Sequence, residues 1–299
     1  MADAVITAPE LPPGGGLTPA VLFSLWGFKG DLAAAITTAR HHGFDGLEAN
    51  LRHPALAPLP AEQVRQQLAE AGLELVLELL TGGDYVPRLD CSPEQHLQEL
   101  QQQLAAAPAL APLRISVLTG SDSWPWPVQQ AFWPEALALA AACPLPVSFE
   151  THRSRSLYSP WQIGAYLESW PQLRLTADLS HWCAVAERLM TPELEPLQAM
   201  AARVDHIHAR VGHAQGPSVG HPFAPEWREA LAAHLRCWQL FAQSRSPASA
   251  GPFTITPEFG PDGYLPQLPF TRQPVADLLE INAAMAAWLR LQPWSPLTP

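Results

Sequence analysis

Four short segments in the second half of the chain combine an apolar face with a polar one. They are residues 146–152, 173–180, 204–210 and 253–258. Successive side chains of a β-strand point to opposite faces, so one face of each segment is apolar. The other face carries Ser148, Glu150 and His152, then Thr176, Asp178 and Ser180, then His206, His208 and Arg210, then Thr254, Thr256 and Glu258. Strands buried in a parallel sheet are usually apolar on both faces. The pattern therefore predicts the floor of a metal or catalytic site.

Apolar runs alternate with amphipathic stretches along the rest of the chain. Four further strands are predicted at 21–28, 46–51, 74–81 and 113–120. Helices are predicted at 31–42, 60–72, 93–107, 134–142, 160–170, 192–202, 225–243 and 274–291. Eight strands alternating with eight helices predict an α/β protein with a (β/α)8 TIM barrel. A doubly wound open sheet is the alternative, but no GxGxxG motif follows the first strand to support it.

The predicted barrel accounts for almost all of the 299 residues. We assign residues 18–292 to a single (β/α)8 barrel domain, because a barrel of roughly 250 residues is a common solution at this length. Residues 1–17 are rich in proline and glycine and are predicted to be irregular or disordered. Residues 293–299 are predicted to form a C-terminal tail.

Charge and composition exclude several kinds of partner. The net charge is −11, and no run of basic residues offers a nucleic-acid surface. No apolar run approaches the roughly 20 residues of a membrane span, and the N-terminus lacks the pattern of a signal peptide. The four cysteines are scattered without a CxxC pair, which favours a reducing compartment. We therefore expect a cytoplasmic protein that binds no nucleic acid and no membrane.

The polar residues near the strand ends suit a metal ion. In a barrel, function lies at the C-terminal ends of the strands, where Glu150, Asp178, His208 and Glu258 fall on strands five to eight. Each residue alone is more often a salt-bridge or capping residue. Three carboxylates buried together without a cation would be strongly unfavourable. Three carboxylates and one imidazole suit one divalent ion, namely Mn²⁺, Mg²⁺, Co²⁺ or Zn²⁺.

The motifs around these residues resemble the xylose-isomerase-like TIM-barrel superfamily. The sequence reads Phe-Glu-Thr-His at 149–152, Ala-Asp-Leu-Ser-His-Trp at 177–182, Asp-His-Ile-His-Ala-Arg at 205–210 and Thr-Pro-Glu-Phe-Gly at 256–260. Gly-Phe-Asp-Gly-Leu-Glu at 43–48 is similar to the strand-two motif of that superfamily. The superfamily includes sugar isomerases and epimerases, inosose dehydratases, hydroxypyruvate isomerases and relatives of endonuclease IV. The resemblance extends from about residue 21 to residue 291.

The resemblance implies that Glu150, Asp178, His208 and Glu258 hold one metal. It also implies that His181 lies beside the substrate, as a hydrogen-bond donor or a further ligand. Glu150 and Glu258 would act as an acid–base pair that transfers a proton next to a carbonyl, while the metal stabilises the enediolate. We therefore expect a divalent-metal-dependent isomerase or epimerase of a small sugar or polyol. Members of such families often pair through helices at the barrel end, which leaves room for a homodimer.

Five further residues are candidates for contact with the substrate. Arg210 faces inward two residues past His208 and would suit an anionic or hydroxyl group. Glu48, at the end of strand two, would contact substrate hydroxyls or else form a cap or a salt bridge. His152 either faces the site or supports Glu150. His206 lies one strand repeat deeper than His208, which favours a buried core histidine over a ligand. Trp182 would wall a sugar pocket or belong to the core.

Some positions depart from the families that the chain resembles. Ketose 3-epimerases have a glutamate where this chain has Ser156 and an arginine where it has Ala214, which disfavours a free-ketose 3-epimerase. The single lysine, Lys29, matches no xylose-isomerase motif. The predicted third and fourth strands lack the histidines of endonuclease IV, and the acidic charge also argues against that activity. A non-catalytic barrel that retains the metal and binds a sugar remains an alternative, as does a metal-dependent dehydratase or hydrolase.

Overall fold

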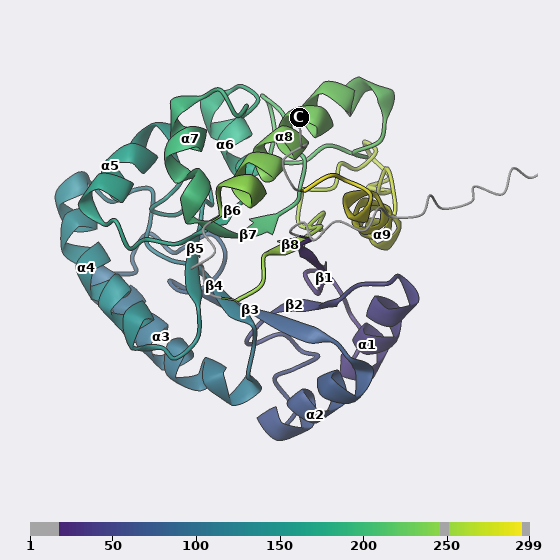
Figure 1. Ribbon diagram of the computed structural model, residues 1–299, viewed down its shortest axis with the longest axis horizontal. Helices are drawn as coiled ribbons and strands as arrows, with labels where there is room; N and C mark the ends of the chain where they lie inside the picture. The colour runs from purple at the N-terminus through teal and green to yellow at the C-terminus, as the bar shows by residue number, and fades with distance from the viewer. Residues whose placement is uncertain (1–17, 246–250, 295–299) are drawn as a thin grey trace, which may run out of the picture.

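Eight parallel strands close into a barrel in which each strand pairs with the next along the chain (Figure 1). This computed structural model describes residues 18–245 and 251–294, so the predicted segment 1–17 and residues 295–299 of the predicted tail lie outside the described residues. The predicted (β/α)8 architecture is confirmed. The strands are β1 (Ala20–Ser24), β2 (Gly46–Asn50), β3 (Glu74–Leu80), β4 (Arg114–Leu118), β5 (Val147–Glu150), β6 (Leu175–Ala177), β7 (Val204–His208) and β8 (Thr254–Thr256).

Helices form a ring around the barrel (Figure 1). They are α1 (Leu32–His41), α2 (Ala61–Ala71), α3 (Pro93–Ala106), α4 (Trp126–Ala142), α5 (Ile163–Ser169), α6 (Leu179–Ala186), α7 (Glu195–Met200), α8 (Arg228–Ser244) and α9 (Leu278–Arg290). Short 3₁₀ helices adjoin them at η1 (Ala107–Leu110), η2 (Pro160–Gln162), η3 (Ala201–Arg203) and η4 (Pro225–Trp227). In the described part of the chain, none of the helices has the length and apolar character that a membrane span needs.

Three helix predictions are corrected by the structure. The helix predicted from Pro134 begins at Trp126, so that Pro134 lies inside α4. The helix predicted from residue 274 begins only after Asp277, whose Oδ1 accepts a hydrogen bond of 3.0 Å from Glu280 N. Helix α6 begins directly after β6 at a position predicted as strand. Asp178 caps it by accepting hydrogen bonds from Ser180 N and Oγ, so the strand ends earlier than its apolar pattern suggests.

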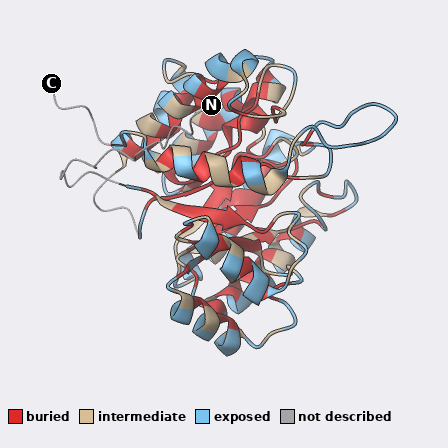
Figure 2. Cartoon of the chain, turned by 90° about the vertical axis from the view of Figure 1, so that its right-hand side faces the viewer, coloured by how far each residue is buried: buried red, intermediate tan, exposed pale blue. Residues whose placement is uncertain are grey.

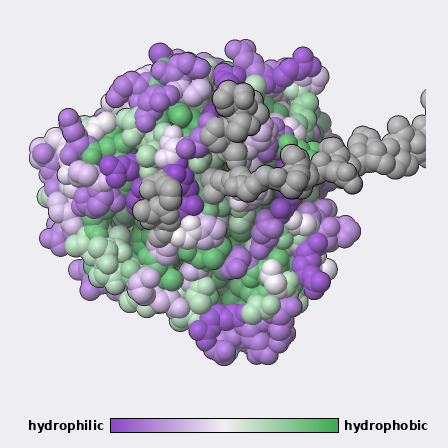
Figure 3. Space-filling model, viewed as in Figure 1, coloured by the Kyte–Doolittle hydropathy of each residue, from purple (hydrophilic) through white to green (hydrophobic). Residues whose placement is uncertain are grey.

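The apolar side chains of the strands point outward, as the alternation of apolar and polar residues predicts. The outward side chains, such as Phe149, Ile207 and Ile255, are buried against the helices. Figure 2 shows the buried residues along the strands and the facing sides of the helices, with exposed residues on the outer surface. On the face seen in Figure 3, hydrophilic groups are spread over the surface with smaller apolar areas between them. The apolar side of each strand thus forms the layer between barrel and helices.

The inside of the barrel carries an unusual polar layer beneath the strand ends. Ser148 Oγ lies 2.8 Å from Thr176 Oγ1, which also accepts a hydrogen bond of 2.9 Å from Ser116 Oγ. On the other side, His206 Nδ1 lies 2.7 Å from Thr254 Oγ1. Barrel interiors are usually filled by branched apolar residues. Here the hydrogen bonds between neighbouring strands support a polar site directly above them.

Strands β6 and β7 pair with a shift in register that places two histidines inside the barrel. Leu175 pairs with Val204, but Thr176 pairs with His206, so Asp205 is left out of the ladder. Asp205 accepts hydrogen bonds of 2.7 and 2.6 Å from Arg174, which holds this irregularity in place. The shift aligns His206 with the inward-facing Thr176.

Candidate metal centre

Four strand ends bring the predicted ligands together. Glu150 ends β5, Asp178 follows β6 directly, His208 ends β7 and Glu258 lies two residues beyond β8. Glu150, Asp178 and His208 each offer one ligand atom, and these atoms lie within 4.8 Å of one another. Glu258 Oε2 lies 3.3 Å from His208 Nδ1. The structure therefore gathers all four residues that the sequence predicts as ligands at the C-terminal end of the barrel.

His208 and Glu150 have buried atoms that point into this cluster. Among the described residues, neither His208 Nδ1 nor Glu150 Oε2 has a hydrogen-bond partner. His208 Nδ1 lies 3.6 Å from Glu150 Oε1, in addition to its approach to Glu258. A buried polar atom without a partner costs about 1–3 kcal/mol. A divalent cation between these atoms would satisfy them, and the set of three carboxylates and one imidazole suits Mn²⁺, Mg²⁺, Co²⁺ or Zn²⁺.

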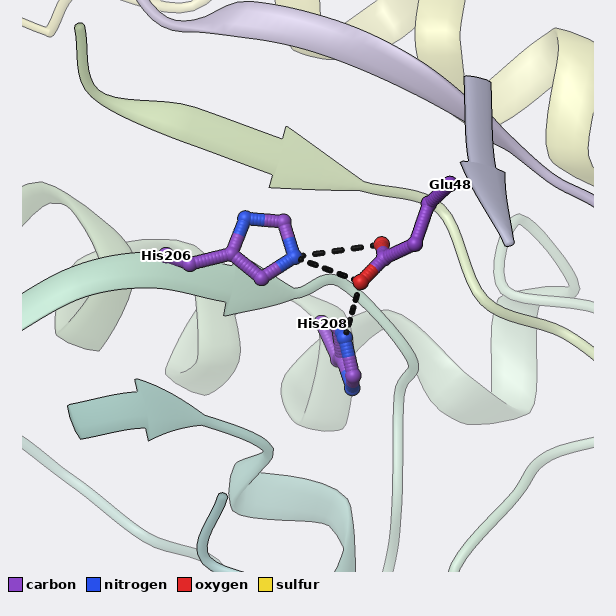
Figure 4. Close-up of side chains that lie close together, drawn as sticks. All are labelled: Glu48, His206 and His208. Atoms are coloured by element: carbon purple, nitrogen blue, oxygen red, sulfur yellow. Dashed lines mark hydrogen bonds and ion pairs between the residues drawn. The ribbon is translucent and has the colours of Figure 1, made fainter. Parts of the chain in front are cut away.

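Glu48 orients the histidine from behind (Figure 4). Its Oε1 lies 3.1 Å from His208 Nε2, and both of its oxygens lie 3.1 Å from His206 Nε2. Each imidazole can donate its Nε2 proton to the carboxylate, and Thr254 Oγ1 can then donate to His206 Nδ1. This tautomer leaves the Nδ1 lone pair of His208 free to face the cluster. A carboxylate that accepts from a ligand histidine in this way fixes the ring and raises its basicity.

The ionisable groups of the cluster shift one another's pKa values. Burial alone would lower the pKa of His208, but Glu258, Glu48 and Glu150 raise it well above the usual value. Burial, together with Glu150 and Asp178, raises the pKa of Glu258 well above the usual value, although His208 and Arg210 act in the opposite direction. Burial tends to raise the pKa of Glu48, yet the two imidazoles bring it well below its usual value. The cluster thus attracts protons or any other cation.

Arg210 is the cation that the protein itself supplies. Its guanidinium is buried and forms an ion pair with Asp178 Oδ2. It also donates to Glu258 Oε2 at 3.2 Å and to Ser180 Oγ at 3.0 Å. The ring of Tyr264 lies 4.6 Å from the guanidinium carbon. Arg210 therefore holds two of the three carboxylates that are predicted as ligands, and the interior position predicted from the sequence is observed.

His181 lies next to Arg210, and His152 packs against His181. His181 Nε2 lies 2.8 Å from Arg210 Nη2, so it accepts a hydrogen bond and the ring is neutral. Its ring centroid lies 4.0 Å from that of His152. Burial lowers the pKa of His181 well below the usual value, and the neighbours His152 and Arg210 act in the same direction. Both rings line the cavity, which is the position that the resemblance implies for His181 and one of the two positions considered for His152.

A cavity of about 450 Å³ opens above the cluster. Aromatic side chains from separate loops form part of its wall. Trp26 packs edge-on against Tyr264 at 5.0 Å between ring centroids and against Tyr85 at 6.2 Å. Gly260 lies directly under Trp26, and a Cβ atom at this position would collide with the indole ring. An aromatic wall beside buried polar groups suits a small polyhydroxylated ligand.

Two of the residues predicted to contact the substrate, Trp182 and His206, do not line the cavity. Trp182 is fully buried in the core, where its Nε1 donates to Leu157 O at 2.9 Å, and it does not line the cavity. His206 lies below the cavity, bonded to Glu48 and Thr254. The structure therefore places both residues as supports of the fold. Glu48 lines the cavity and bonds both histidines, so it is a partner of His208, the predicted ligand.

The structure adds residues that the sequence pattern does not place in the site. Asn50 and Glu78 line the cavity from β2 and β3, and Asn50 Nδ2 donates to Glu78 Oε1 at 3.3 Å. The signal for Glu78 is a carboxylate in the middle of an apolar strand, where a leucine would be ordinary. Tyr85 and Tyr264 lie in loops with no pattern that points to a site.

Comparison with known proteins agrees with this architecture. Residues 36–226 match the family model described as a xylose isomerase-like TIM barrel. No curated protein matches the chain. Among solved structures, an L-ribulose 3-epimerase is 15% identical with a TM-score of 0.64, and the match covers 92% of this chain and 95% of that one.

Two other solved structures illustrate the range of the fold. The probable 3-DHS dehydratase AsbF of Bacillus anthracis is 13% identical with a TM-score of 0.58, and the match covers 92% of this chain and 100% of that one. The IolI protein with a bound zinc atom is 11% identical with a TM-score of 0.59, over 91% and 95% of the two chains. At such identities the likeness is one of fold alone. The family model, however, matches well over half of the sequence, and the chain therefore belongs to the xylose isomerase-like TIM-barrel family.

Proposed function

We propose that the chain is a divalent-metal-dependent isomerase or epimerase. It transfers a proton at the carbon next to the carbonyl group of a small sugar or polyol-like substrate. The observation that carries this proposal is the buried, unpartnered Nδ1 of His208, which three carboxylates surround at the floor of an aromatic-walled cavity. The epimerase, the dehydratase and the zinc-containing protein among the solved structures of this fold support it.

The residues divide the chemistry between binding and proton transfer. Glu150, Asp178, His208 and Glu258 would hold the ion, which supplies polarisation of a substrate carbonyl oxygen when bound. Glu150 and Glu258 serve as the proton acceptor and donor. Both carboxyl groups line the cavity, where a substrate carbon can approach them.

Other side chains position the substrate. The neutral His181 offers an imidazole at the cavity wall, next to Arg210. The aromatic rings of Trp26 and Tyr264 exclude water and offer an apolar surface to the carbon skeleton. Ser156, which stands where ketose 3-epimerases have a glutamate, donates to Gln129 Oε1 at 2.7 Å and does not line the cavity. The substrate contacts of this chain therefore differ from those of the ketose 3-epimerases.

The first test is metal content. Elemental mass spectrometry of protein purified without chelator should find about one equivalent of Mn, Co, Zn or Fe, or about one equivalent of Mg after incubation with Mg²⁺. The double substitution Glu150→Gln/Glu258→Gln should abolish it. An exposed carboxylate on β3, replaced in Glu74→Gln, is the matched control. Equal metal content in the wild type and the double variant, or none in either after incubation with Mn²⁺, would remove the four-ligand site.

The second test separates an enzyme from a binding protein. Metal-loaded protein is incubated in deuterated water with D-allulose, L-ribulose and related ketoses, and NMR follows the exchange of the hydrogen next to the carbonyl. Exchange that depends on Glu150 and Glu258 supports the proposed reaction. Thermal stabilisation by a sugar without exchange would instead indicate a barrel that binds its ligand without turnover.

A further inference from the structure

Arg155 is a buried arginine near the site that the reaction proposed above does not use. It lies in the loop that follows β5, shortly after Glu150, and its side chain is fully buried. Within the described residues it forms no ion pair, and the hydrogen bonds of its guanidinium all go to main-chain carbonyl oxygens. Burial of a charge outside an ion pair is costly. This cost indicates a specific role for the side chain.

The guanidinium mainly holds one segment, residues 81–92 between β3 and α3, here called the β3 loop. Nη1 donates to Thr81 O at 2.6 Å, and Nε donates to Tyr85 O at 3.0 Å. Nη2 donates to Asp84 O between these two points. An arginine can make such a set of bonds because its N–H donors lie in one rigid plane. Arg155 therefore fixes the path of the β3 loop where the loop leaves the strand.

The β3 loop needs such an anchor because of its glycines. Gly82 and Gly83 follow one another with φ of +77° and +107°, in the region that favours glycine. Glycine also gives a chain more conformational freedom than any other residue. Gly82 N donates to Glu99 Oε2 at 2.8 Å, but Asp84 and Tyr85 lie beyond this point. Gly83 and Asp84 are exposed, so packing does not fix this part of the loop.

Tyr85 is the side chain of the β3 loop that forms the cavity wall with Trp26. Its ring centroid lies 6.2 Å from that of Trp26 and 6.3 Å from that of His152. Ser154, the neighbour of Arg155, also donates to Tyr85 O at 3.2 Å, and its Oγ lies 3.0 Å from His152 Nδ1. Arg155 itself lies behind the wall and does not line the cavity. Its effect on a bound molecule must therefore pass through Tyr85.

We propose that Arg155 is a positioning residue that determines how tightly the site binds its sugar. It fixes the β3 loop in advance, so that Tyr85 already stands beside Trp26 when the sugar enters. A loop that is fixed in its bound conformation raises affinity, because binding no longer has to order it. The β3 loop contributes none of the four predicted metal ligands, so the metal affinity should not depend on its path. This inference rests on the proposed function, because it presupposes that the cavity binds a small sugar.

The first part of the test asks whether Arg155 fixes the β3 loop. Hydrogen–deuterium exchange measured by mass spectrometry compares the Mn²⁺-loaded wild type with Arg155→Met. We expect peptides from residues 81–92 to exchange about tenfold faster in the variant, while peptides from β6 to β8 keep their rates. Arg88→Met is the control, because Arg88 lies on the same loop and is exposed. Unchanged exchange of the β3 loop in Arg155→Met would overturn the inference. Arg155→Lys, which keeps the charge and loses the planar set of donors, takes its place if Arg155→Met does not fold.

The second part asks whether Arg155 acts on the sugar through Tyr85. Calorimetric titrations with D-allulose and the other ketoses of the panel compare the Mn²⁺-loaded wild type, Arg155→Met, Tyr85→Ala and the double variant. We expect each single substitution to weaken sugar binding by about tenfold, and the double variant to bind no more weakly than Tyr85→Ala. The rate of C–H exchange at saturating sugar should stay within about threefold of the wild type, and the Mn²⁺ affinity within about twofold.

The outcomes separate this inference from the proposed function. Sugar affinity that Arg155→Met leaves unchanged would overturn this inference alone, as would losses that add up in the double variant. A loss of Mn²⁺ affinity as large as the loss of sugar affinity would show general damage to the fold and would also overturn it. No binding of any ketose to the wild type would overturn the proposed function and this inference with it.

Discussion

Replacement of Glu48 by glutamine tests whether the carboxylate behind His208 sets the strength of the metal site. The side chain is only 3% exposed and contacts His206 and His208 at 3.1 Å. Glutamine has the same size, and its oxygen can still accept from His208 Nε2. Its NH₂ group can donate to His206 if that ring moves its proton to Nδ1, which lies 3.2 Å from Thr254 O. The variant can thus keep its hydrogen bonds and lose only the negative charge.

The loss of charge has a size that can be worked out. A hydrogen bond to a charged acceptor contributes about 1.5–3 kcal/mol, against about 0.5–1.5 kcal/mol for a neutral one. The difference of roughly 1–1.5 kcal/mol corresponds to about a tenfold change in a binding constant. Substitution of a carboxylate that supports a ligand histidine typically lowers metal affinity by 10–100-fold. We therefore expect Glu48→Gln to weaken Mn²⁺ binding by about 10–100-fold.

Calorimetric titration of chelator-treated protein with Mn²⁺ measures this effect. The comparison is between the wild type, Glu48→Gln and the exposed control Glu74→Gln, with circular dichroism to confirm that each is folded. An affinity of Glu48→Gln within twofold of the wild type would refute the argument that Glu48 tunes His208. An equal loss in Glu74→Gln would show that the change in overall charge is responsible instead.

Four other consequences can be measured. Arg210→Met leaves two buried carboxylates without their cation, so the free energy of unfolding of the metal-free protein should fall by about 3–5 kcal/mol in urea titrations. Mn²⁺ should restore part of this loss, and the exposed control Arg65→Met should change little. Gly260→Ala should displace Trp26, weakening sugar binding but not metal binding, and unchanged sugar affinity would argue against that wall. Burial lowers the pKa of His234 to about 4, so the unfolded chain binds a proton below pH 6.5 that the folded chain does not, and the free energy of unfolding should fall by up to about 3 kcal/mol between pH 7 and pH 4. In His234→Gln, the dependence of this free energy on pH should be smaller by about 1.4 kcal/mol per pH unit near pH 5, and an identical dependence would contradict the assignment. Metal binding should release protons, seen as a dependence of the calorimetric enthalpy on the buffer, because metal ligands must be deprotonated, and a buffer-independent enthalpy would contradict this.

The alternation of side chains is enough to predict the barrel and the ligand cluster. Glu150 and His208 each follow an apolar residue that packs outward, Phe149 and Ile207, so a period of two assigns both to the inner face from the sequence alone. The parallel order of the strands then brings them to the same end. The same rule overestimates the length of β6. There the Asp178 side chain caps a helix, and this local hydrogen bond ends the strand although an apolar residue follows.

The cavity walls are harder to predict, because their residues depend on paths that loops take in space. Tyr85 and Tyr264 are far apart in the sequence and meet Trp26 only in the folded chain. Trp182 follows the motif histidine directly, but one step along α6 rotates its side chain by about 100° away from the cavity. Glu78 lies in a run of apolar residues, and only the closed barrel shows that its inward face opens into the cavity rather than the core.

The charges of the cluster explain why these residues form a site and not merely a polar core. Glu150, Asp178 and Glu258 carry three negative charges when ionised, and Arg210 returns one positive charge through its ion pairs with the last two. Among these four side chains, the remaining two negative charges equal in size the charge of a divalent cation. His208 responds to this excess, because its pKa rises well above the usual value beside Glu258 even though burial opposes the proton. Apolar residues of similar size would fill the same space at lower cost. The protein therefore keeps, in its interior, an arrangement of charge that a divalent metal would neutralise.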